Sequence, residues 1–305
     1  MGSRPTLIVN HRSGRGRQQR AVVAAALARG MAIRHLTPTV DGAAAARRAV
    51  RDGADVLAAA GGDGTVSAVA AVAVETNVPL VVVPCGTRNH FAGDCGADIA
   101  DPPRMLTALE TGEEHRVDVG SVNGRLFVNN VSLGFYAASL QDPRYRHGRL
   151  RVTRRYLRRA ALGTGKAVTL TAPKPSRVVL PSQALAVLVS NNAYFPTIAP
   201  EGALRPRLSG GALWVYVLGV PTGTGMVGTR IARRVLRLLS GRAQVAAWAV
   251  DRQTITVDAP RIPAAIDGEA TQLGGALAFA SHPGALRVLR PPSVDTPTTR
   301  FRLQW

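Results

Sequence analysis

Short apolar runs alternate with longer segments of helical periodicity over the first part of the chain. Runs of four or five mostly apolar residues predict β-strands, and segments whose apolar residues recur every three or four positions predict helices. The predicted strands are residues 6–10, 33–36, 56–60 and 80–83, and the predicted helices are residues 18–29, 43–51, 66–75 and 104–109. This alternation is typical of an α/β domain with a parallel sheet, which binds its ligands at the carboxyl ends of its strands.

The pattern changes near residue 120, where short strands bounded by glycine and proline follow one another. The predicted strands here are residues 126–131, 168–171, 178–180, 184–190, 213–218, 244–250 and 254–258. Frequent short strands of this kind predict an antiparallel β-sandwich. We therefore predict an α/β plus all-β fold with two domains, residues 1–120 and 121–290, and a loosely tethered tail, residues 291–305.

The third predicted strand leads into a glycine-rich turn at the start of a helix. This turn consists of Gly61, Gly62, Asp63, Gly64 and Thr65. Glycine allows a tight turn and a close ligand approach, and the N–H groups and dipole of a helix N-terminus favour a phosphate. A carboxylate repels phosphate unless a cation lies between them, so Asp63 indicates Mg²⁺ or a partner hydroxyl. The alternative, an ordinary turn with an aspartate cap, accounts for fewer of these residues.

Two other predicted strands end in polar, glycine-containing loops. The first strand ends in Asn10, which is followed by Ser13 and Gly14, and the fourth leads into Gly86, Thr87 and Asn89. Carboxyl ends of neighbouring parallel strands lie at one edge of the sheet, so these loops can line one ligand site. The first loop is equally consistent with an ordinary connection between strand and helix.

Together these blocks resemble the diacylglycerol kinase catalytic-domain family, which includes sphingosine kinases and is related to NAD kinases and 6-phosphofructokinases. The GGDGT block matches the signature of that family. The sequence after the fourth strand is similar to its P-x-G-T-x-N-D-F-A motif with His90 in place of the aspartate, and His11 replaces the proline of its first motif. The resemblance implies that Thr37 or Thr39 contacts the nucleotide and that Asp118, in a D-x-G motif, helps Asp63 to organise Mg²⁺. It thus implies ATP bound in the first domain and a substrate bound in the second.

Asp267-Gly268-Glu269 is the candidate source of a general base. Residues two apart on a strand share one face, so both carboxylates could act together. Asp-Gly is also a common turn dipeptide, and on the residues alone the turn is the better interpretation. The D-G-E motif of the family implies that Asp267 or Glu269 accepts the substrate proton, and it does not separate them.

One stretch departs from the family pattern. Many bacterial members have Asn-Asp-Gly-x-Leu before a late strand, and its aspartate helps to hold a structural Mg²⁺. This chain has Gly210 at the aspartate's position, so such a metal would depend on backbone carbonyls near Arg207 and Ala212. The sequence therefore argues against this second metal site.

The formal net charge is +19, which predicts attraction to anionic partners. Arginines are interleaved with aromatic and aliphatic residues over residues 144–159 and 229–242, which suits an anionic membrane surface better than an ordinary solvated helix face. An aromatic content of 5% leaves few stacking platforms for nucleic acid, which we disfavour as a partner. No apolar run is long enough to span a membrane and the N-terminus lacks a signal-peptide core. We expect a cytoplasmic protein at the inner face of the plasma membrane, and we allow for a homodimer.

The resulting hypothesis is an ATP-dependent, Mg²⁺-assisted lipid kinase with diacylglycerol as the default substrate and phosphatidic acid as the product. The alternatives are a kinase for another alcohol, such as a sphingoid base, a polyprenol or NAD, and a non-catalytic protein that binds nucleotide or nucleic acid.

Overall fold

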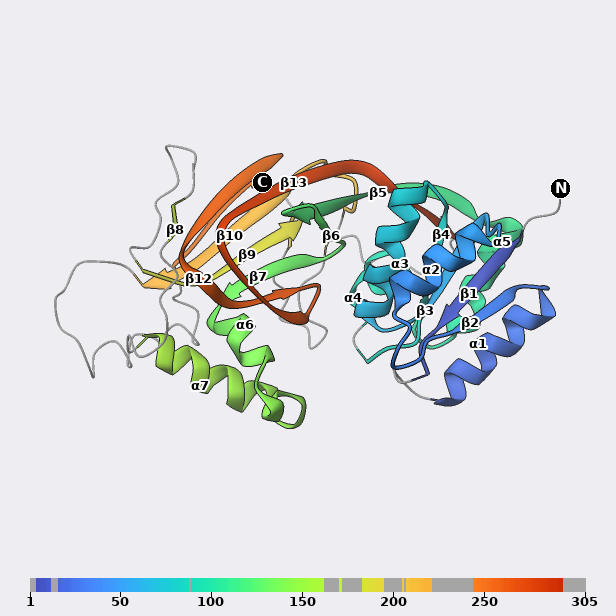
Figure 1. Cartoon of the computed structure of the whole chain (residues 1–305), viewed down its shortest axis with the longest axis horizontal. Helices are drawn as coiled ribbons and strands as arrows, with labels where there is room; N and C mark the ends of the chain where they lie inside the picture. The colour runs from blue at the N-terminus through green and yellow to red at the C-terminus, as the bar shows by residue number, and fades with distance from the viewer. Residues whose placement is uncertain are drawn as a thin grey trace, which may run out of the picture. The chain divides into compact units, whose positions relative to one another are not determined.

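The computed structural model describes residues 4–11, 16–87, 89–161, 170–171, 183–194, 205, 207–220 and 244–292. The chain divides into two compact units, Met1–Arg116 with Leu286–Trp305 and Val117–Ala285 (Figure 1). Two long strands, β5 (Glu113–Val122) and β13 (Glu269–Arg290), contribute residues to both units.

The first unit is built on a parallel sheet. Its strands are β1 (Pro5–Val9), β2 (Ala32–His35), β3 (Val56–Gly61) and β4 (Leu80–Pro84), and its helices are α1 (Gly16–Ala28), α2 (Gly42–Arg51), α3 (Asp63–Thr76), α4 (His90–Asp94), the 3-10 helix η1 (Pro102–Thr107) and α5 (Ala108–Thr111). The strand order is β13–β4–β3–β1–β2, and every pairing along it is parallel. The predicted helix over residues 104–109 is wrong in type, because a 3-10 helix that starts with two prolines occupies most of it.

The core of the first unit lies on both faces of this sheet. Alternate residues of β1, β3 and β4 pack with residues of α1 and η1, and this cluster includes Leu7, Ala58, Val81, Val22 and Leu106. The intervening strand residues are fully buried as well, as a parallel sheet covered on both faces requires. The sheet is therefore buried on both faces, and the loops that follow its parallel strands lie at one edge.

The second unit is antiparallel. Its strands are β5, β6 (Arg125–Phe127), β7 (Asn130–Gly134), β8 (Leu170–Thr171), β9 (Gln183–Asn191), β10 (Leu213–Val220), β11 (Gln244–Val250), β12 (Arg252–Ile266) and β13, and its helices are α6 (Phe135–Leu140), the 3-10 helix η2 (Pro143–His147) and α7 (Arg149–Ala161). The order β11–β10–β9–β7–β12–β13 is antiparallel at each pairing. A cluster of buried residues that includes Phe127, Leu133, Val189, Trp248 and Leu277 fills its core.

The parallel N-terminal and antiparallel C-terminal strands confirm the predicted fold class. Several boundaries differ from the prediction. The strand predicted at 126–131 is two strands, β6 and β7, and the strand predicted at 254–258 is part of the much longer β12. Contacts place the boundary after Arg116 rather than after residue 120, and they assign residues 286–290 to the first unit. The strand predicted at 178–180 and nearly all of the predicted tail lie outside the described residues.

Candidate active site

The glycine-rich turn between β3 and α3 is closed tightly on itself. A Cβ at Gly61 would lie 2.6 Å from the Cβ of Thr65, so only glycine fits there without a shift. The N-cap of the 14-residue helix α3 is Gly62, which has no side chain to bond the first N–H groups of the helix. The turn therefore presents backbone N–H groups at the positive end of a helix dipole.

The loop after β4 packs against this turn through its backbone. A Cβ at Gly86 would lie 2.3 Å from the Cα of Gly62, and the N–H of Cys85 donates to the carbonyl of Gly61 at 3.1 Å. The Asn89 side chain closes the loop, since its Oδ1 accepts from the Gly86 N–H at 2.7 Å and its Nδ2 donates to the Gly86 carbonyl at 2.9 Å. Asn89 has a φ of 53°, a left-handed conformation that asparagine tolerates well. The structure thus brings the two predicted loops together, with Thr87 exposed between Gly86 and Asn89.

Asp63 lies at the first position of α3, half-buried. Its Oδ1 accepts from the backbone N–H of Phe91, at 3.3 Å, and Phe91 is fully buried in α4. The carboxylate therefore lies beside both glycine loops. A carboxylate at this place is the hard oxygen donor that Mg²⁺ prefers, so Asp63 fits a role in holding the cation.

The end of β1 joins the same turn through Asn10. Its Nδ2 donates to the Thr65 hydroxyl at 3.0 Å, and its carbonyl accepts from Nε2 of Gln19 at 2.7 Å. Gln19 is buried in α1, and the sequence analysis missed it, although a glutamine on the apolar face of a predicted helix is a usable signal. The neighbouring candidates Ser13 and Gly14 lie outside the described residues.

The candidates after β2 form a local turn. The N–H groups of Thr39 and Val40 both donate to the Thr37 hydroxyl, at 3.3 and 3.1 Å, and the two threonine hydroxyls are 3.1 Å apart. Both threonines are exposed. These hydrogen bonds lie within the turn, so they do not single out either threonine.

Asp118 belongs to the second unit, whereas Asp63 belongs to the first. Asp118 is 2% exposed, and its two oxygens accept from the backbone N–H groups of Gly211 and Gly284 at 2.7 and 2.8 Å. Its carboxylate thus connects β5 to two segments far along the chain. Among the described residues, no group of three or more histidine, cysteine or acidic side chains could hold a metal ion.

Asp267 and Glu269 do not share one strand, so the expectation that alternation places them on one face is wrong. Asp267 and Gly268 have φ angles of 49° and 82° and form the two-residue turn between β12 and β13. Asp267 is 6% exposed and accepts from three backbone N–H groups, those of Val128, Asn129 and Asn130, at 2.9, 2.7 and 3.1 Å. Glu269 is exposed and pairs with Arg125 at 3.5 Å. The turn that the Asp-Gly dipeptide predicts is therefore present. The Asp267 carboxylate on it is buried and fixed, whereas the Glu269 carboxylate is exposed to solvent.

The side chain of Asn192 occupies the space beside Gly210. Oδ1 of Asn192 accepts from the Gly210 N–H at 2.8 Å and would lie 2.5 Å from a Cβ at that position. The carbonyl of Ala212 accepts from the Asn192 N–H. The Ala212 carbonyl, which the sequence offers to a second metal, thus accepts a hydrogen bond within the protein.

Two other features bear on the predicted chemistry. Burial raises the pKa of the Cys85 thiol to about 11, which disfavours the reactive thiolate at neutral pH. No helix among the described residues is both long and apolar enough to cross a membrane.

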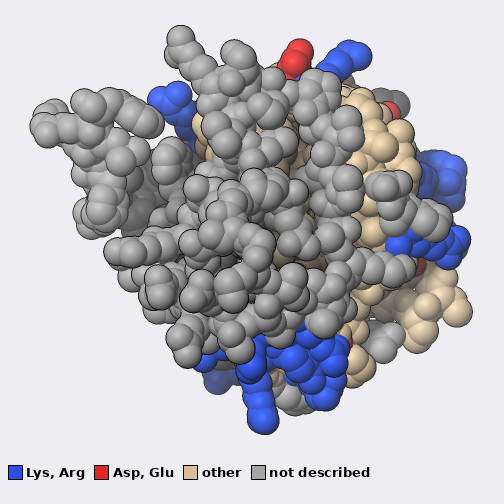
Figure 2. Space-filling view, turned by 90° about the vertical axis from the view of Figure 1, so that its left-hand side faces the viewer, with Lys and Arg blue, Asp and Glu red and all other residues tan. Residues whose placement is uncertain are grey.

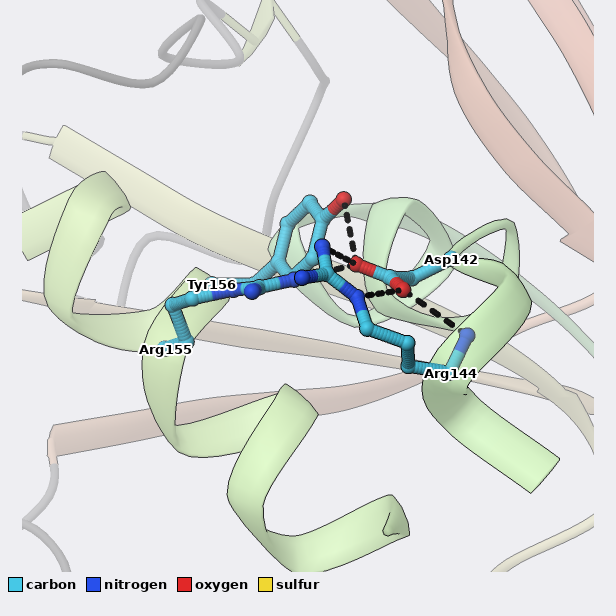
Figure 3. A network of polar contacts seen from close by, with 4 residues as sticks. All are labelled: Asp142, Arg144, Arg155 and Tyr156. Carbon is cyan, nitrogen blue, oxygen red and sulfur yellow. Dashed lines mark hydrogen bonds and ion pairs between the residues drawn. The ribbon is translucent and has the colours of Figure 1, made fainter. Parts of the chain in front are cut away.

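The arginine-rich segment 144–159 forms η2 and α7, and a single aspartate organises it (Figure 3). The Asp142 side chain is 2% exposed and accepts bonds from Arg144, Arg155 and Tyr156. Hydrogen bonds from Arg144 hold the pKa of the Asp142 carboxyl well below its usual range, with a further charge effect from Arg155. The arginines thus favour the ionised form of Asp142.

The other face of α7 carries exposed arginines. Val152 and Leu157 are buried, whereas Arg151, Arg154, Arg158 and Arg159 are exposed. Figure 2 shows lysine and arginine side chains gathered at the lower edge of one face, the level at which α7 lies in Figure 1. The second arginine-rich segment, 229–242, lies outside the described residues.

Comparisons with known proteins agree with the motifs. Residues 4–122 match the model of the diacylglycerol kinase catalytic domain. A protein of Chromohalobacter salexigens named "Probable lipid kinase YegS-like" is 39% identical over 101 residues, 32% of each chain. A diacylglycerol kinase of Staphylococcus aureus is 39% identical over 94 residues, 29% of each chain. The matched segments thus span about a third of the length of these curated relatives.

The likeness of fold extends much further. A crystal structure of a diacylglycerol kinase from Bacillus anthracis superposes with a TM-score of 0.64 at 18% identity and covers 95% of this chain and 97% of that one. At this identity the likeness concerns the fold alone. The resemblance to the diacylglycerol kinase catalytic-domain family that the motifs predict is confirmed, and residues 4–122 are the part of the chain that its model matches.

Proposed function

We propose that this protein is an ATP-dependent kinase that transfers the γ-phosphate to a hydroxyl of a membrane lipid, with diacylglycerol as the default substrate. The observation that carries the proposal is the pair of glycine loops at the ends of β3 and β4. Gly86 approaches Gly62 so closely that a Cβ would lie 2.3 Å from its Cα. The names of the relatives support lipid phosphorylation as the reaction.

In this proposal the N–H groups of the first turn of α3 bind the phosphates of ATP, and the Gly86 loop, whose Gly86 N–H is bonded to Asn89, packs against that turn. Phosphoryl transfer needs mainly positioning and charge balance, which such donors supply without reorganisation. Asp63 holds Mg²⁺, which neutralises phosphate charge when it is bound. Asp118, which the family resemblance also assigns to Mg²⁺, accepts two backbone N–H bonds, and we propose that it acts mainly by fixing the segments that contain Gly211 and Gly284.

We propose Asp267 as the acceptor of the lipid hydroxyl proton. An acceptor works best where it is fixed and shielded from water, and Asp267 is buried with a defined orientation, whereas Glu269 is exposed. Three N–H donors stabilise the charged carboxylate, so we expect it to orient the hydroxyl and to take its proton late. In a loose phosphoryl-transfer transition state the attacking hydroxyl carries little charge, so a weak base is sufficient.

Vesicle-dependent ATP turnover tests this proposal. Purified protein, radiolabelled ATP and Mg²⁺ are incubated with vesicles made from a total lipid extract, and the labelled lipid is identified by chromatography. We expect label in phosphatidic acid and none when Mg²⁺ is chelated. Label in a sphingoid base or polyprenol product identifies a different alcohol, whereas label in NADP after addition of NAD, or no lipid label at all, contradicts the lipid kinase proposal.

The arginine face of α7 supports an anionic membrane surface as the place of action. Exposed arginines lie beside Leu150, which is 62% exposed, and this combination suits a lipid headgroup region. The proposal places the protein peripherally at the cytoplasmic face of the plasma membrane. Light scattering of the purified protein tests the homodimer that the sequence analysis allows for.

A further inference from the structure

Three consecutive residues of the second unit have every backbone polar group bonded. In the segment Val128 to Asn130, the three N–H groups donate to the Asp267 carboxylate. The carbonyl of Asn129 accepts from the N–H of Asn191, and that of Asn130 accepts from the N–H of Asp267. The carbonyl of Val128 accepts from Asn191 Nδ2 at 3.1 Å and from a guanidinium at 2.6 Å. The segment from the end of β6 to the first residue of β7 is therefore a fixed part of the structure.

The guanidinium belongs to Arg205, which is 4% exposed. Its Nη1 donates to the carbonyls of Val128 and Asn191 at 2.6 and 3.2 Å, and its Nη2 donates to Oδ1 of Asn129 at 2.6 Å. Its carbon Cζ lies 5.5 Å from the centre of the Tyr194 ring, within the range of a cation–π contact. Arg205 and Asp267 thus contact the same short segment through its opposite polar groups.

A single peptide group links the two charges. The carbonyl of Val128, which accepts from Arg205, and the N–H of Asn129, which donates to Asp267 at 2.7 Å, belong to one peptide unit. A hydrogen bond to the carbonyl of a peptide polarises the group and strengthens the bond that its N–H donates. In a buried position such an effect is larger than in water, because the local dielectric is low.

We infer that Arg205 is a positioning residue for Asp267, and that it acts through the peptide group that joins Val128 to Asn129. The consequence for catalysis rests on the proposed function, in which Asp267 accepts the proton of the lipid hydroxyl. Arg205 fixes the backbone N–H groups that orient the Asp267 carboxylate, and it strengthens the hydrogen bonds by which they stabilise the carboxylate charge. A lysine can keep one of these bonds, whereas methionine keeps the aliphatic bulk and no donor.

The coupling can be measured without any turnover. Protein labelled with ¹³C at the valine carbonyl and ¹⁵N at the asparagine amide gives selective signals from Val-Asn peptides, which in this sequence are Val9-Asn10, Val122-Asn123 and Val128-Asn129. Spectra are compared for the parent, Arg205→Met, Arg205→Lys and Asp267→Asn, with Arg261→Met as the control because Arg261 is an exposed arginine of β12.

We expect the Asn129 amide proton to move to higher field in Arg205→Met and in Asp267→Asn, and to move less in Arg205→Lys. The other two Val-Asn signals should keep their positions in all variants, and Arg261→Met should change none of the three. An Asn129 signal that stays at its parental position in Arg205→Met overturns the inference. A shift of all three signals together shows general loss of structure and overturns it as well.

Kinetics on lipid vesicles provide the second readout. We expect Arg205→Met to lower kcat by roughly tenfold to a hundredfold, the loss usual for residues that orient a functional ligand, with KM for ATP unchanged and partial recovery in Arg205→Lys. A rise in KM for ATP with an unchanged kcat contradicts a role that acts on Asp267. If the parent protein phosphorylates no lipid while the Asn129 signal behaves as expected, the proposed function fails and the coupling stands.

Discussion

The candidate carboxylates of the two units are held in different ways. Asp63 starts a helix and accepts from Phe91 at 3.3 Å, a contact that links two neighbouring loops. Asp118 and Asp267 accept shorter bonds, of 2.7–3.1 Å, from backbone N–H groups that lie 93–166 residues away in the sequence. The first unit builds its site from local turns, whereas the second uses its acids to tie distant segments together. Substitution of the carboxylate of the first unit, Asp63, should therefore change chemistry alone, whereas substitution of the carboxylates of the second unit should change stability as well.

Asp63→Asn should show the largest effect on turnover. Asparagine keeps the oxygen that accepts from Phe91 but loses the charge that would hold Mg²⁺, so the fold should survive. We expect a loss of at least about two to three orders of magnitude in kcat on vesicles, comparable to the loss of one key electrostatic contact. Glu75→Gln, near the other end of α3, is the matched control and should keep the parental rate. A folded Asp63→Asn protein with near-parental activity would disprove the assignment.

Asp267→Asn and Glu269→Gln compare a buried carboxylate with an exposed one. In Asp267→Asn an amide replaces one oxygen and meets a backbone donor, so we expect the free energy of unfolding to fall by about 1–3 kcal/mol. Turnover should fall by more than about a hundredfold, within the usual range for loss of a proton acceptor. Glu269→Gln should change stability by less than about 0.5 kcal/mol, as is typical of surface positions.

Urea unfolding and ATP calorimetry separate the two effects in these variants. The affinity for ATP should stay near the parental value in both, because the nucleotide loops belong to the first unit. A large loss of turnover in Glu269→Gln with a normal rate in Asp267→Asn would transfer the acceptor role to Glu269. Parental rates in both variants would remove the general-base assignment from this turn altogether.

The difference between the units also explains what the sequence could reveal. The turn from Gly61 to Thr65 was predictable because glycine geometry, helix start and chemistry all lie within a few residues. The turn at Asp267 was predictable from the Asp-Gly dipeptide, whereas the burial of its carboxylate was not, since the N–H groups that it binds are 137–139 residues away. The return of β13 to pair Val288 with Leu80 was hidden for the same reason. Arg205 gave no signal at all, because an isolated arginine in a basic chain looks like an exposed residue.

Gly86→Ala tests whether the first unit depends on close backbone packing. The new Cβ would meet the Cα of Gly62 at 2.3 Å, and backbone atoms cannot yield cheaply. We expect the free energy of unfolding to fall by about 1–3 kcal/mol, a common cost of overpacking, with weaker ATP binding.

Gly93→Ala is the matched control for this prediction. A Cβ at Gly93 would meet nothing within 4 Å, and the residue lies in α4. Alanine is the better helix former, so stability should stay within about 1 kcal/mol of the parent or rise. Equal behaviour of the two alanine variants in thermal unfolding and calorimetry would show that the loops do not need to touch.

The smallest effect concerns the surface of the second unit. Replacement of Arg151, Arg154 and Arg158 by glutamine removes exposed charge from α7 and leaves the bonds of Asp142 in place. Each arginine near an anionic membrane contributes about 1 kcal/mol, so the triple variant should bind anionic vesicles less tightly by a factor of roughly a hundred at low salt. The difference should fade as added salt screens the charges.

The control removes three exposed helical arginines from the first unit, Arg20, Arg48 and Arg51, and keeps the same net charge as the α7 variant. If the binding follows net charge alone, both triple variants should sediment equally with the vesicles, and α7 is then not the membrane surface. A larger loss for the α7 variant, with neutral vesicles bound weakly by all three proteins, would locate the membrane contact on this helix.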